Sequence, residues 1–585
     1  MLAILGKQLV IGFAPIAALM GAGCAASFSG ADQKLNPNKI VEVDLTGDLA
    51  ISSGEPQICI DPQNPLHIAT IEYGHGSLLF PVYELGPSRQ EIERDRAASN
   101  GGTDGDISIS NDGGRTWKKL PRPDPVAVPP LMNTPFKRKG AADPMIACGP
   151  NGALYVAEEL DPWSRPAGRP GFPFDTPDVE PAIAASSDFG KTWSAPFIIP
   201  TPSDRPWLTV DQSTGKVYSV SSGYLDFVAH NHNIPGANAI FDRWLVAYSP
   251  LLKSYSAPRR LGGPDFLGAA GNTIAAAHGI IAATFVIGPS MSTSGNPSST
   301  LGDHETCAGL SYDVCHIENV LGEAPHVVLN GRYISPPAPN AHFVDSTAGD
   351  IPGSLRSAVP PEISKCSREQ PCLFMETSSD DGQNWVRHYV PVPGGFSPGG
   401  AHLAVDAGHA GRYAIGLLSS DRSKLRIVVT DDSGVTWSAP SEIAETAKGI
   451  DFKEWMAYGP TGVLGFMWKK QRDDMQPEST EVIHTGYDWI DTPTPGFDIY
   501  NSISCDGGFR WESPVKVNAK TSPGGISRND DLSYIALDGT ASHLVWGDRR
   551  ILPQVHNVPG AYGGTHAFYG RVPFSVVNGG NKCGR

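Results

Sequence analysis

The sequence predicts an all-β protein built as a single β-propeller, and three observations lead to that prediction. A Ser/Thr-x-Asp-x-Gly-x-x-Trp pattern recurs five times along the 585 residues. A pair of short β runs, joined by a turn that usually carries glycine, recurs seven times. The chain also holds 65 glycines and 52 prolines, which suit many turns better than many helices. Internal repetition of this kind indicates a repeat architecture.

The recurring pattern predicts a folded turn between two antiparallel strands. Its aspartate can accept hydrogen bonds from the backbone that follows, its glycine permits a positive φ, and its tryptophan can pack between neighbouring sheets. An eroded sixth copy becomes visible when 184–196 is aligned with 246–258, where Tyr255 stands in place of tryptophan. These residues are expected to hold the turn and to take no part in chemistry. The intact copies begin at Ser110, Ser186, Ser378, Thr430 and Ser504.

The paired β runs give the number of blades. They lie at 59–73, 147–159, 210–222, 275–286, 405–418, 457–468 and 536–546. Each is followed by a third and a fourth strand, so the unit is strand A, turn, strand B, loop, strand C, turn, strand D. The last unit lacks its fourth strand, which the β run 39–45 can supply. We therefore expect seven four-stranded blades closed by an N-terminal strand, because closure removes open sheet edges. A six-bladed ring with one additional unit is the alternative.

The N-terminal segment predicts export. Residues 1–24 carry one charge, Lys7, and an apolar run that is too short to span a membrane, which is typical of a signal peptide. Residues 20–24 resemble a lipoprotein cleavage box with Cys24 as the lipidated residue, and simple secretion is the alternative. A linker at 25–38 and a propeller at 39–578 follow. A net charge of −16 disfavours nucleic acid and anionic membranes as partners. Membrane contact is therefore expected only through Cys24, and the protein is expected to be a monomer.

The cysteines predict disulfide bonds. Setting Cys24 aside leaves eight, an even number in a chain expected to be exported. The predicted pairs are Cys59 with Cys148, Cys307 with Cys315, Cys366 with Cys372 and, by elimination, Cys505 with Cys583. No His/Cys spacing suggests a zinc site, so no cofactor is expected, with a structural cation such as calcium as the alternative.

One face of the propeller is expected to carry the function. The A–B and C–D turns lie on one face and are short, whereas the B–C and D–A connections lie on the other. Long loops gathered on a rigid scaffold commonly carry binding and catalysis. The long B–C segments are 74–104, 159–179, 224–241, 289–370, 469–497 and 548–565, of which 289–370 is a loop insertion.

Polar residues at that face are the candidate site. The candidates at the starts of A strands are Glu55, Asp143, Asp204, Arg205 and Trp207, and those at or just beyond the ends of B strands are Glu158, Arg422, Lys469 and Arg549. Converging carboxylates disfavour joint ionisation, which suits one of them to act as an acid and another as a base at a glycosidic bond. We therefore assign Asp204, Asp143 and Glu158 to catalysis.

The remaining candidates are assigned to substrate binding. The arginines Arg205, Arg422 and Arg549 would hold an anionic substituent, because a guanidinium fork matches a carboxylate. Glu55 lies at the same mouth, and Trp207 and Trp455 would either stack on sugar rings or pack in the core.

The five repeats are Asp-boxes, and from about residue 40 to 575 the chain resembles the sialidase-like β-propeller superfamily. The resemblance implies three arginines that bind a sugar carboxylate, a tyrosine nucleophile assisted by a glutamate, and an aspartate that protonates the leaving group. Sialidases have six blades, and their first arginine lies in a Phe/Tyr-Arg-Ile-Pro motif at the first A strand. Here residues 53–56 read Ser-Gly-Glu-Pro, and the nearest equivalent is Asp-Arg-Pro-Trp at 204–207.

Three functions follow as hypotheses. The first is an exported glycoside hydrolase of the exo-sialidase type that acts on an acidic glycan. The second is a non-catalytic propeller that binds a glycan or a protein. The third is an envelope scaffold lipoprotein, which depends on lipidation of Cys24.

Overall fold

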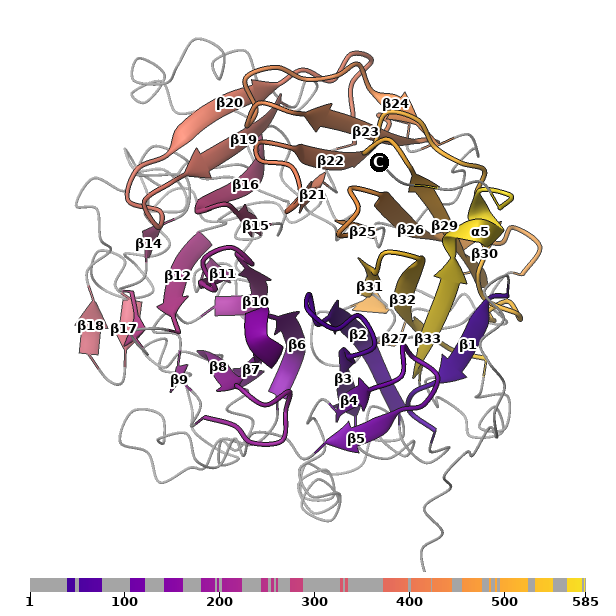
Figure 1. Cartoon of the computed structure of the whole chain (residues 1–585), viewed down its shortest axis with the longest axis horizontal. Helices are drawn as coiled ribbons and strands as arrows, with labels where there is room; N and C mark the ends of the chain where they lie inside the picture. Colours follow the sequence, from indigo (N-terminus) through magenta and orange to yellow (C-terminus); the bar gives the residue numbers. More distant parts are fainter. Residues whose placement is uncertain are drawn as a thin grey trace, which may run out of the picture. The chain divides into compact units, whose positions relative to one another are not determined.

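A computed structural model of the chain shows seven four-stranded antiparallel sheets arranged as the blades of a propeller (Figure 1). The chain divides into two units, Met1–Asn36 and Pro37–Arg585, and every described residue belongs to the second. The structure describes residues 39–47, 52–75, 106–120, 141–160, 180–194, 197–198, 203–223, 243–250, 254–256, 259–260, 274–287, 327–329, 332–334, 372–397, 401–421, 423–443, 455–475, 483–484, 490–491, 495–523, 532–550, 565–580 and 583. The predicted signal peptide and most of the 289–370 insertion lie outside these residues.

The first six blades run outward from strand A to strand D in sequence order. The first three are β2 (Ser52–Ile60), β3 (Ile68–His75), β4 (Asp106–Ser110) and β5 (Lys118–Leu120); β6 (Ala141–Cys148), β7 (Leu154–Leu160), β8 (Glu180–Ser186) and β9 (Phe197–Ile198); and β10 (Ser203–Val210), β11 (Val217–Gly223), β12 (Arg243–Ser249) and β13 (Ser254–Tyr255). A short strand, β14 (Arg259–Arg260), also pairs with β12.

The next three blades repeat this order. They are β15 (Ile274–Ala277), β16 (Ile280–Ile287), β19 (Cys372–Ser378) and β20 (Val386–Val390); β21 (Ala401–Val405), β22 (Tyr413–Leu418), β23 (Leu425–Thr430) and β24 (Ser441–Glu442); and β25 (Trp455–Tyr458), β26 (Leu464–Gln471), β29 (Phe497–Ser504) and β30 (Val515–Lys516). Two small hairpins lie apart from the blades, β17 (Val327–Leu329) with β18 (Arg332–Ile334) and β27 (Ile483–His484) with β28 (Ile490–Asp491).

The seventh blade contains strands from both ends of the chain. Its order is β31 (Ser533–Leu537), β32 (Ala541–Asp548), β33 (His566–Pro573) and β1 (Val41–Asp44), which is outermost. The inner strands contact one another in turn, from β2 through β6, β10, β15, β21, β25 and β31 and back to β2, so the ring is closed. The prediction of seven blades closed by an N-terminal strand is confirmed, and the six-bladed alternative is excluded.

The closing strand is fixed by backbone pairing and by charge. Val41 pairs with Arg571 across the β1–β33 ladder. Glu42 forms an ion pair with Arg550 at 2.5 Å, and an Asp44 oxygen lies 3.0 Å from His566 Nδ1. The Arg550 guanidinium also lies 4.3 Å from the centre of the Phe568 ring. These contacts join the N-terminal strand to elements at the other end of the chain.

Apolar side chains fill the space between neighbouring blades. Every residue of β22 and of β32 is buried, which shows that a middle strand is covered on both of its faces. Burial of this kind explains why the B strands read as nearly continuous apolar runs rather than as alternating ones. The largest buried side chains include Trp468 and Trp546.

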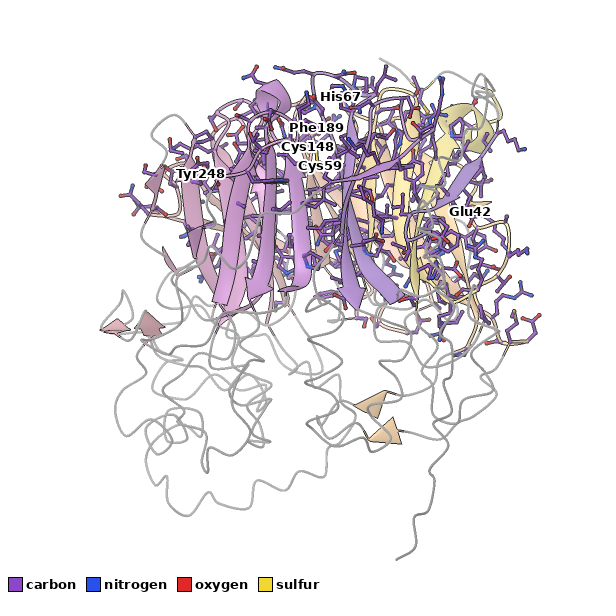
Figure 2. All side chains as sticks on the ribbon, turned by 90° about the horizontal axis from the view of Figure 1, so that it is seen from below. Glu42, Cys59, His67, Cys148, Phe189 and Tyr248 are labelled. Carbon is purple, nitrogen blue, oxygen red and sulfur yellow. A yellow bond between two sulfur atoms is a disulfide. The ribbon has the colours of Figure 1, made fainter. Side chains whose placement is uncertain are left out.

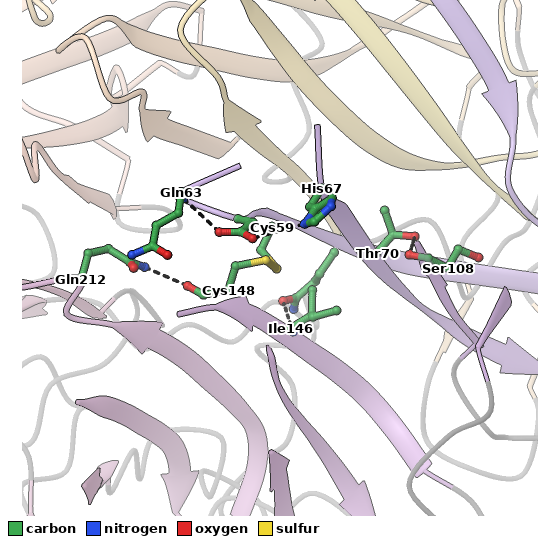
Figure 3. The surroundings of a disulfide bond; sticks show 10 residues. Cys59, Gln63, His67, Thr70, Ser108, Ile146, Cys148 and Gln212 are labelled. Atoms are coloured by element: carbon green, nitrogen blue, oxygen red, sulfur yellow. Dashed lines mark hydrogen bonds and ion pairs between the residues drawn. A yellow bond between two sulfur atoms is a disulfide. The ribbon is translucent and has the colours of Figure 1, made fainter. Parts of the chain in front are cut away.

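Two disulfides join segments that are distant in the sequence. Cys59 of β2 is bonded to Cys148 of β6, so the bond links the inner strands of the first two blades (Figure 3). Cys505 is bonded to Cys583 near the C-terminus. Both predicted pairs are confirmed. Cys372 is also in a disulfide, while Cys307, Cys315 and Cys366 lie outside the described residues. Disulfides are compatible with an exported protein.

Helix is almost absent from the described residues. They contain one turn of 3₁₀-helix, Pro150–Gly152, and a four-residue helix, α5 (Phe574–Val577), which directly follows β33 in the sequence. No helix in this part of the chain has the length and apolarity that crossing a bilayer requires.

Candidate functional site

The five Asp-boxes form turns whose polar groups bond to one another. In the first box, the Ser110 hydroxyl donates to Asp112 Oδ1 at 2.8 Å and accepts the Gly114 N–H at 2.8 Å. Asp112 also accepts the backbone N–H of Thr116 at 2.9 Å and its hydroxyl at 2.7 Å. The Trp117 indole donates to the Gly114 carbonyl at 3.2 Å. The predicted turn-holding role of the pattern is confirmed for these groups.

Hydrogen bonding also explains the charge state of three of the box aspartates. The hydroxyl and backbone of Thr192, together with Ser186, lower the pKa of the Asp188 carboxyl to about 2. Asp380 and Asp432 have pKa values of about 2 for the same kind of reason. A carboxylate that is ionised and already occupied by donors is a poor general acid at neutral pH.

The eroded sixth box keeps one feature of the intact ones. Ser194, two positions before the proline of the second box, donates its backbone N–H to Ala185 and accepts the Ala185 N–H on its hydroxyl. Ser256 makes the same two bonds with Ala247, at 2.7 and 3.0 Å. The alignment of the two segments is therefore confirmed by geometry, although the aspartate and tryptophan are gone.

The Asp-box turns and the A–B turns lie at the same end of the blades. Figure 2 shows His67, from an A–B turn, and Phe189, from a box, at one end of the strands. The two kinds of turn are also bonded within a blade, since Phe189 N–H donates to the Gly152 carbonyl at 3.0 Å and Gly113 N–H to the Leu66 carbonyl at 2.9 Å. We call this end the Asp-box face, and the end at which the A strands begin the opposite face.

Three neighbouring A strands share a bulge near the opposite face. The register of β2, β6 and β10 shifts at a dipeptide that ends in proline, and the dipeptides are Glu55-Pro56, Asp143-Pro144 and Arg205-Pro206. Proline has no N–H to give to a ladder, so a bulge is where a strand accommodates it. Glu55 has a φ of +45°, which is unusual for a residue with a side chain. The structure therefore sets two acids and an arginine at equivalent backbone positions.

The described side chains of the predicted site are buried. Glu55 is 6% exposed, Trp207 is 6% exposed and Arg549 is 3% exposed. The backbone of Asp143 lies in β6, that of Glu158 in β7 and those of Asp204 and Arg205 in β10, but their side chains are not among those described. Arg422 lies outside the described residues. These site assignments remain predictions.

Arg549 and Lys469, which the sequence analysis predicted to lie at the same face, are both close to the ring of Phe497. The Lys469 ammonium lies 4.8 Å from the centre of the Phe497 ring, and the Arg549 guanidinium lies 5.2 Å from it. Lys469 is 2% exposed. Asp498, the next residue, accepts from Lys516 at 2.7 Å and from Arg472 at 3.1 Å. The Phe497 ring thus lies close to cationic side chains from the ends of β26 and β32, which are the B strands of the sixth and seventh blades.

An aromatic cluster crosses the axis of the ring just inside the bulges. Trp207 of the third blade stacks on Trp455 of the sixth, with ring centres 5.3 Å apart and planes at 12°. Tyr534 of the seventh blade lies 4.3 Å from Trp455, and His402 of the fifth lies 4.6 Å from it. Side chains from blades on opposite sides of the ring therefore meet. We call Trp207, His402, Trp455 and Tyr534 the aromatic plug.

The plug is continued by the residues that follow the other two bulges. Gln57 and Met145 hold the same position in β2 and β6 that Trp207 holds in β10. The Gln57 amide contacts Met145 Sδ, and the Tyr534 hydroxyl lies 4.0 Å from the same sulfur. The sequence singled out Trp207 and Trp455, gave Tyr534 no role because no motif marks it as a nucleophile, and missed His402, Gln57 and Met145. Their signal was position alone, at or near the start of an A strand.

Burial also governs the titration of His402. Desolvation lowers the pKa of its imidazole to about 4, so the ring is neutral at physiological pH. Among the described side chains, no group of three or more His, Cys, Asp or Glu converges as a metal site would.

Comparison with known proteins finds similarity over part of the chain. No protein-family model matches the chain. A 151-residue stretch is 29% identical to a sialidase of Bacteroides fragilis, and it covers 23% of this chain and 26% of that relative. The same chain forms Asp-box turns in a propeller of seven blades. The chain is therefore an Asp-box β-propeller that is similar to a sialidase over part of its length. The match spans about a quarter of the curated relative, so activity and substrate do not transfer with it.

Solved structures with some likeness to this propeller include several sialidases. A Hadza microbial sialidase gives a TM-score of 0.37 at 12% identity, over 81% of this chain and 72% of its own. A Trypanosoma rangeli sialidase in complex with sialic acid gives 0.32 at 11% identity, over 78% and 55%. A protein of unknown function from Dyadobacter fermentans gives 0.34 at 12% identity, over 91% and 99%. Likeness at this level says nothing of substrate.

Proposed function

We propose that this sialidase-like propeller is an exported, glycan-directed protein that acts as a glycoside hydrolase on an acidic glycan at its opposite face. The observation that carries the proposal is the row of three proline bulges. It sets Glu55, Asp143 and Arg205 at equivalent positions on three adjacent inner strands. Bulges are often found beside active sites, where they redirect a side chain.

The proposed chemistry divides between acids and cations. One of Asp143, Glu158 and Asp204 would protonate the leaving oxygen, and a second would act as base or stabilise the cationic transition state. Arg205 and Arg549 would hold the anionic substituent of the sugar, with Arg422 as a further candidate. The two cations near the Phe497 ring support this part by their position, because both lie at or just beyond the ends of B strands at the proposed face.

A panel of fluorogenic glycosides, both sialosides and neutral sugars, tests the proposal on the purified protein. We expect turnover of at least one acidic glycoside. Arg205→Ala should lower kcat/KM by about 100-fold, since it removes a charged contact worth roughly 3 kcal/mol. The matched control is Arg115→Ala, which removes an exposed cation from an Asp-box turn and should leave turnover unchanged. Equal losses in both variants, or no turnover of any glycoside, would count against hydrolysis.

A non-catalytic glycan-binding propeller is the second candidate, and one observation favours it. In this chain a buried glutamate, Glu55, stands at the first A strand where the resemblance implies an arginine. A glycan array separates the two functions, because a binder retains specific glycans that it does not cleave. Export is part of both proposals and is tested by N-terminal sequencing of the mature protein, with Cys24→Ala to detect a lipid anchor.

A further inference from the structure

The aromatic plug contains two buried nitrogen atoms without hydrogen-bond partners. Trp207 Nε1 and His402 Nδ1 are both inaccessible to solvent, and neither finds a partner among the described residues. Both rings lie against the same indole, that of Trp455, at 5.3 and 4.6 Å between ring centres. A buried polar atom that lacks a hydrogen-bond partner costs about 1–3 kcal/mol, so two such atoms beside one ring require an explanation.

The two nitrogens define the chemistry of a partner. An indole N–H can only donate, and a neutral imidazole offers one donor and one acceptor nitrogen. Because burial keeps His402 neutral, its Nδ1 either donates or accepts according to the tautomer, so the pair suits a group that accepts from Trp207 and can also accept from or donate to His402. A hydroxyl group does both. A carboxylate could accept from both nitrogens only if His402 carried its proton on Nδ1, and it would then bring an unpaired charge into a buried, neutral site, whereas an ammonium cannot accept from the indole.

The position of the plug makes it reachable from the face that carries the proposed function. Trp207, His402 and Trp455 lie near the starts of β10, β21 and β25, beside the level of the three bulges. Trp455 and His402 are partly exposed, although Trp207 is buried. Aromatic faces beside hydroxyl-binding groups match a sugar, which has apolar C–H faces and polar edges.

We infer that Trp207, His402 and Trp455 form a hydroxyl-binding subsite that receives one neutral sugar hydroxyl at the floor of the site. The inference rests on the proposed function in taking the ligand to be a glycan. It adds that recognition at the floor is uncharged, whereas the cations at the ends of the B strands hold the anionic group. A trapped water has the same donor and acceptor capacity, so the test must separate water from sugar.

Nuclear magnetic resonance of the full chain, with ¹⁵N in the indole of tryptophan, reads the subsite directly. The Trp207 indole signal is assigned by its loss in Trp207→Phe, which retains an aromatic ring in the stack. The labelled protein is titrated with N-acetylneuraminic acid, galactose and N-acetylglucosamine. We expect the Trp207 signal to shift with at least one sugar. Trp207→Phe and His402→Phe should bind that sugar about threefold to tenfold more weakly.

Trp193→Phe is the matched control. Its indole nitrogen is also buried without a partner among the described residues, but it belongs to an Asp-box. This variant should bind the sugar as the wild type does. Because the titration of the wild type is informative by itself, the test stands even if a plug variant fails to fold.

The outcomes separate this inference from the proposed function. If a glycoside is cleaved or a sugar binds while the Trp207 signal stays fixed, the inference is overturned and the proposed function survives. If the Trp207 indole signal does not shift and its N–H proton exchanges with solvent at every sugar concentration, the nitrogens bind water. That result also overturns the inference. If no sugar binds and no glycoside turns over, both fail. If no glycoside turns over but the Trp207 signal shifts with a sugar, hydrolysis fails and the subsite stands.

Discussion

Removing the disulfide between Cys59 and Cys148 should lower the stability of the propeller by an amount that follows from the chain it closes. The two cysteines are separated by 89 residues. Closing a loop of that length lowers the entropy of the unfolded chain and stabilises the folded one by about 4.5 kcal/mol at 25 °C. The replacement Cys59→Ala with Cys148→Ala should therefore lower the free energy of unfolding by about this amount.

The measurement is denaturant unfolding followed by tryptophan fluorescence, with the slope compared between proteins so that a change of midpoint reports stability. The matched control is Cys505→Ala with Cys583→Ala, whose separation of 78 residues gives nearly the same expected loss. Since the two closed loops do not overlap in the sequence, the losses should add when all four cysteines are replaced.

Two results would refute the reasoning. If the Cys59/Cys148 variant unfolds at the wild-type midpoint, the loop is already constrained in the unfolded chain. If the losses in the free energy of unfolding from the two disulfides do not add, the disulfides stabilise a common unit, and the loop-entropy account is wrong.

Three further predictions concern single residues. Gly114→Ala should destabilise the protein by more than about 3 kcal/mol, because the added Cβ would lie 1.9 Å from the Tyr569 hydroxyl at a φ of +86°. The control Gly152→Ala has a φ of +72° but no atom within 4 Å and should cost about 1 kcal/mol, as thermal unfolding would show. Burial raises the pKa of Glu376 to about 7 despite its bond to Arg387, so its folded form holds the proton more tightly than its unfolded form. Stability should therefore fall as pH rises from about 4.5 to 7. Glu376→Gln should flatten that slope, and an unchanged slope would contradict the assignment. Glu42→Gln weakens the closing strand's bond to Arg550 and should cost about 2 kcal/mol. Glu442→Gln removes a charge from an exposed pair with Lys424 and should lower the free energy of unfolding by less than about 1 kcal/mol. Equal losses in Glu42→Gln and Glu442→Gln would contradict this expectation.

The blades could be predicted because each one repeats the same local requirements. A turn that needs a carboxylate, a positive φ and an apolar ring leaves those residue types at fixed spacing, as in Asp112, Gly114 and Trp117. The missing fourth strand of the last unit was equally visible, and 39–45 was the β run left over. Gradual loss of the pattern, as at Tyr255, was still recognisable from the flanking serine.

The aromatic plug could not be predicted in the same way. Trp207 and Trp455 come from the third and sixth blades, and no spacing in the sequence connects them. Their contact depends on the diameter of the ring and on the bulge that precedes Trp207, which are properties of the assembled fold. The proline dipeptides were visible, but only the register of β2, β6 and β10 shows that they hold equivalent positions.

The sequence also could not predict the buried cluster of side chains through which the last blade contacts the first Asp-box. His543 lies between Asp538 at 3.0 Å and the Tyr569 hydroxyl at 2.7 Å, and Tyr569 in turn packs against Trp117 at 4.8 Å. Each residue alone is unremarkable in the sequence. Their association follows from ring closure, which brings the two ends of the repeat array together.

The pairing of β1 with β33 constrains how the protein can be made. Strand β1 is the first described strand, and it pairs with β33, which begins at His566, so this pairing can form only after most of the chain has been synthesised. Until then the edge of β1 lacks this partner. An open edge of this kind invites pairing with other chains. A product truncated before His566 would lose the strand between β32 and β1 and leave both unpaired at their outer edges. Such a fragment should be a substrate for chaperones and proteases rather than a smaller working ring.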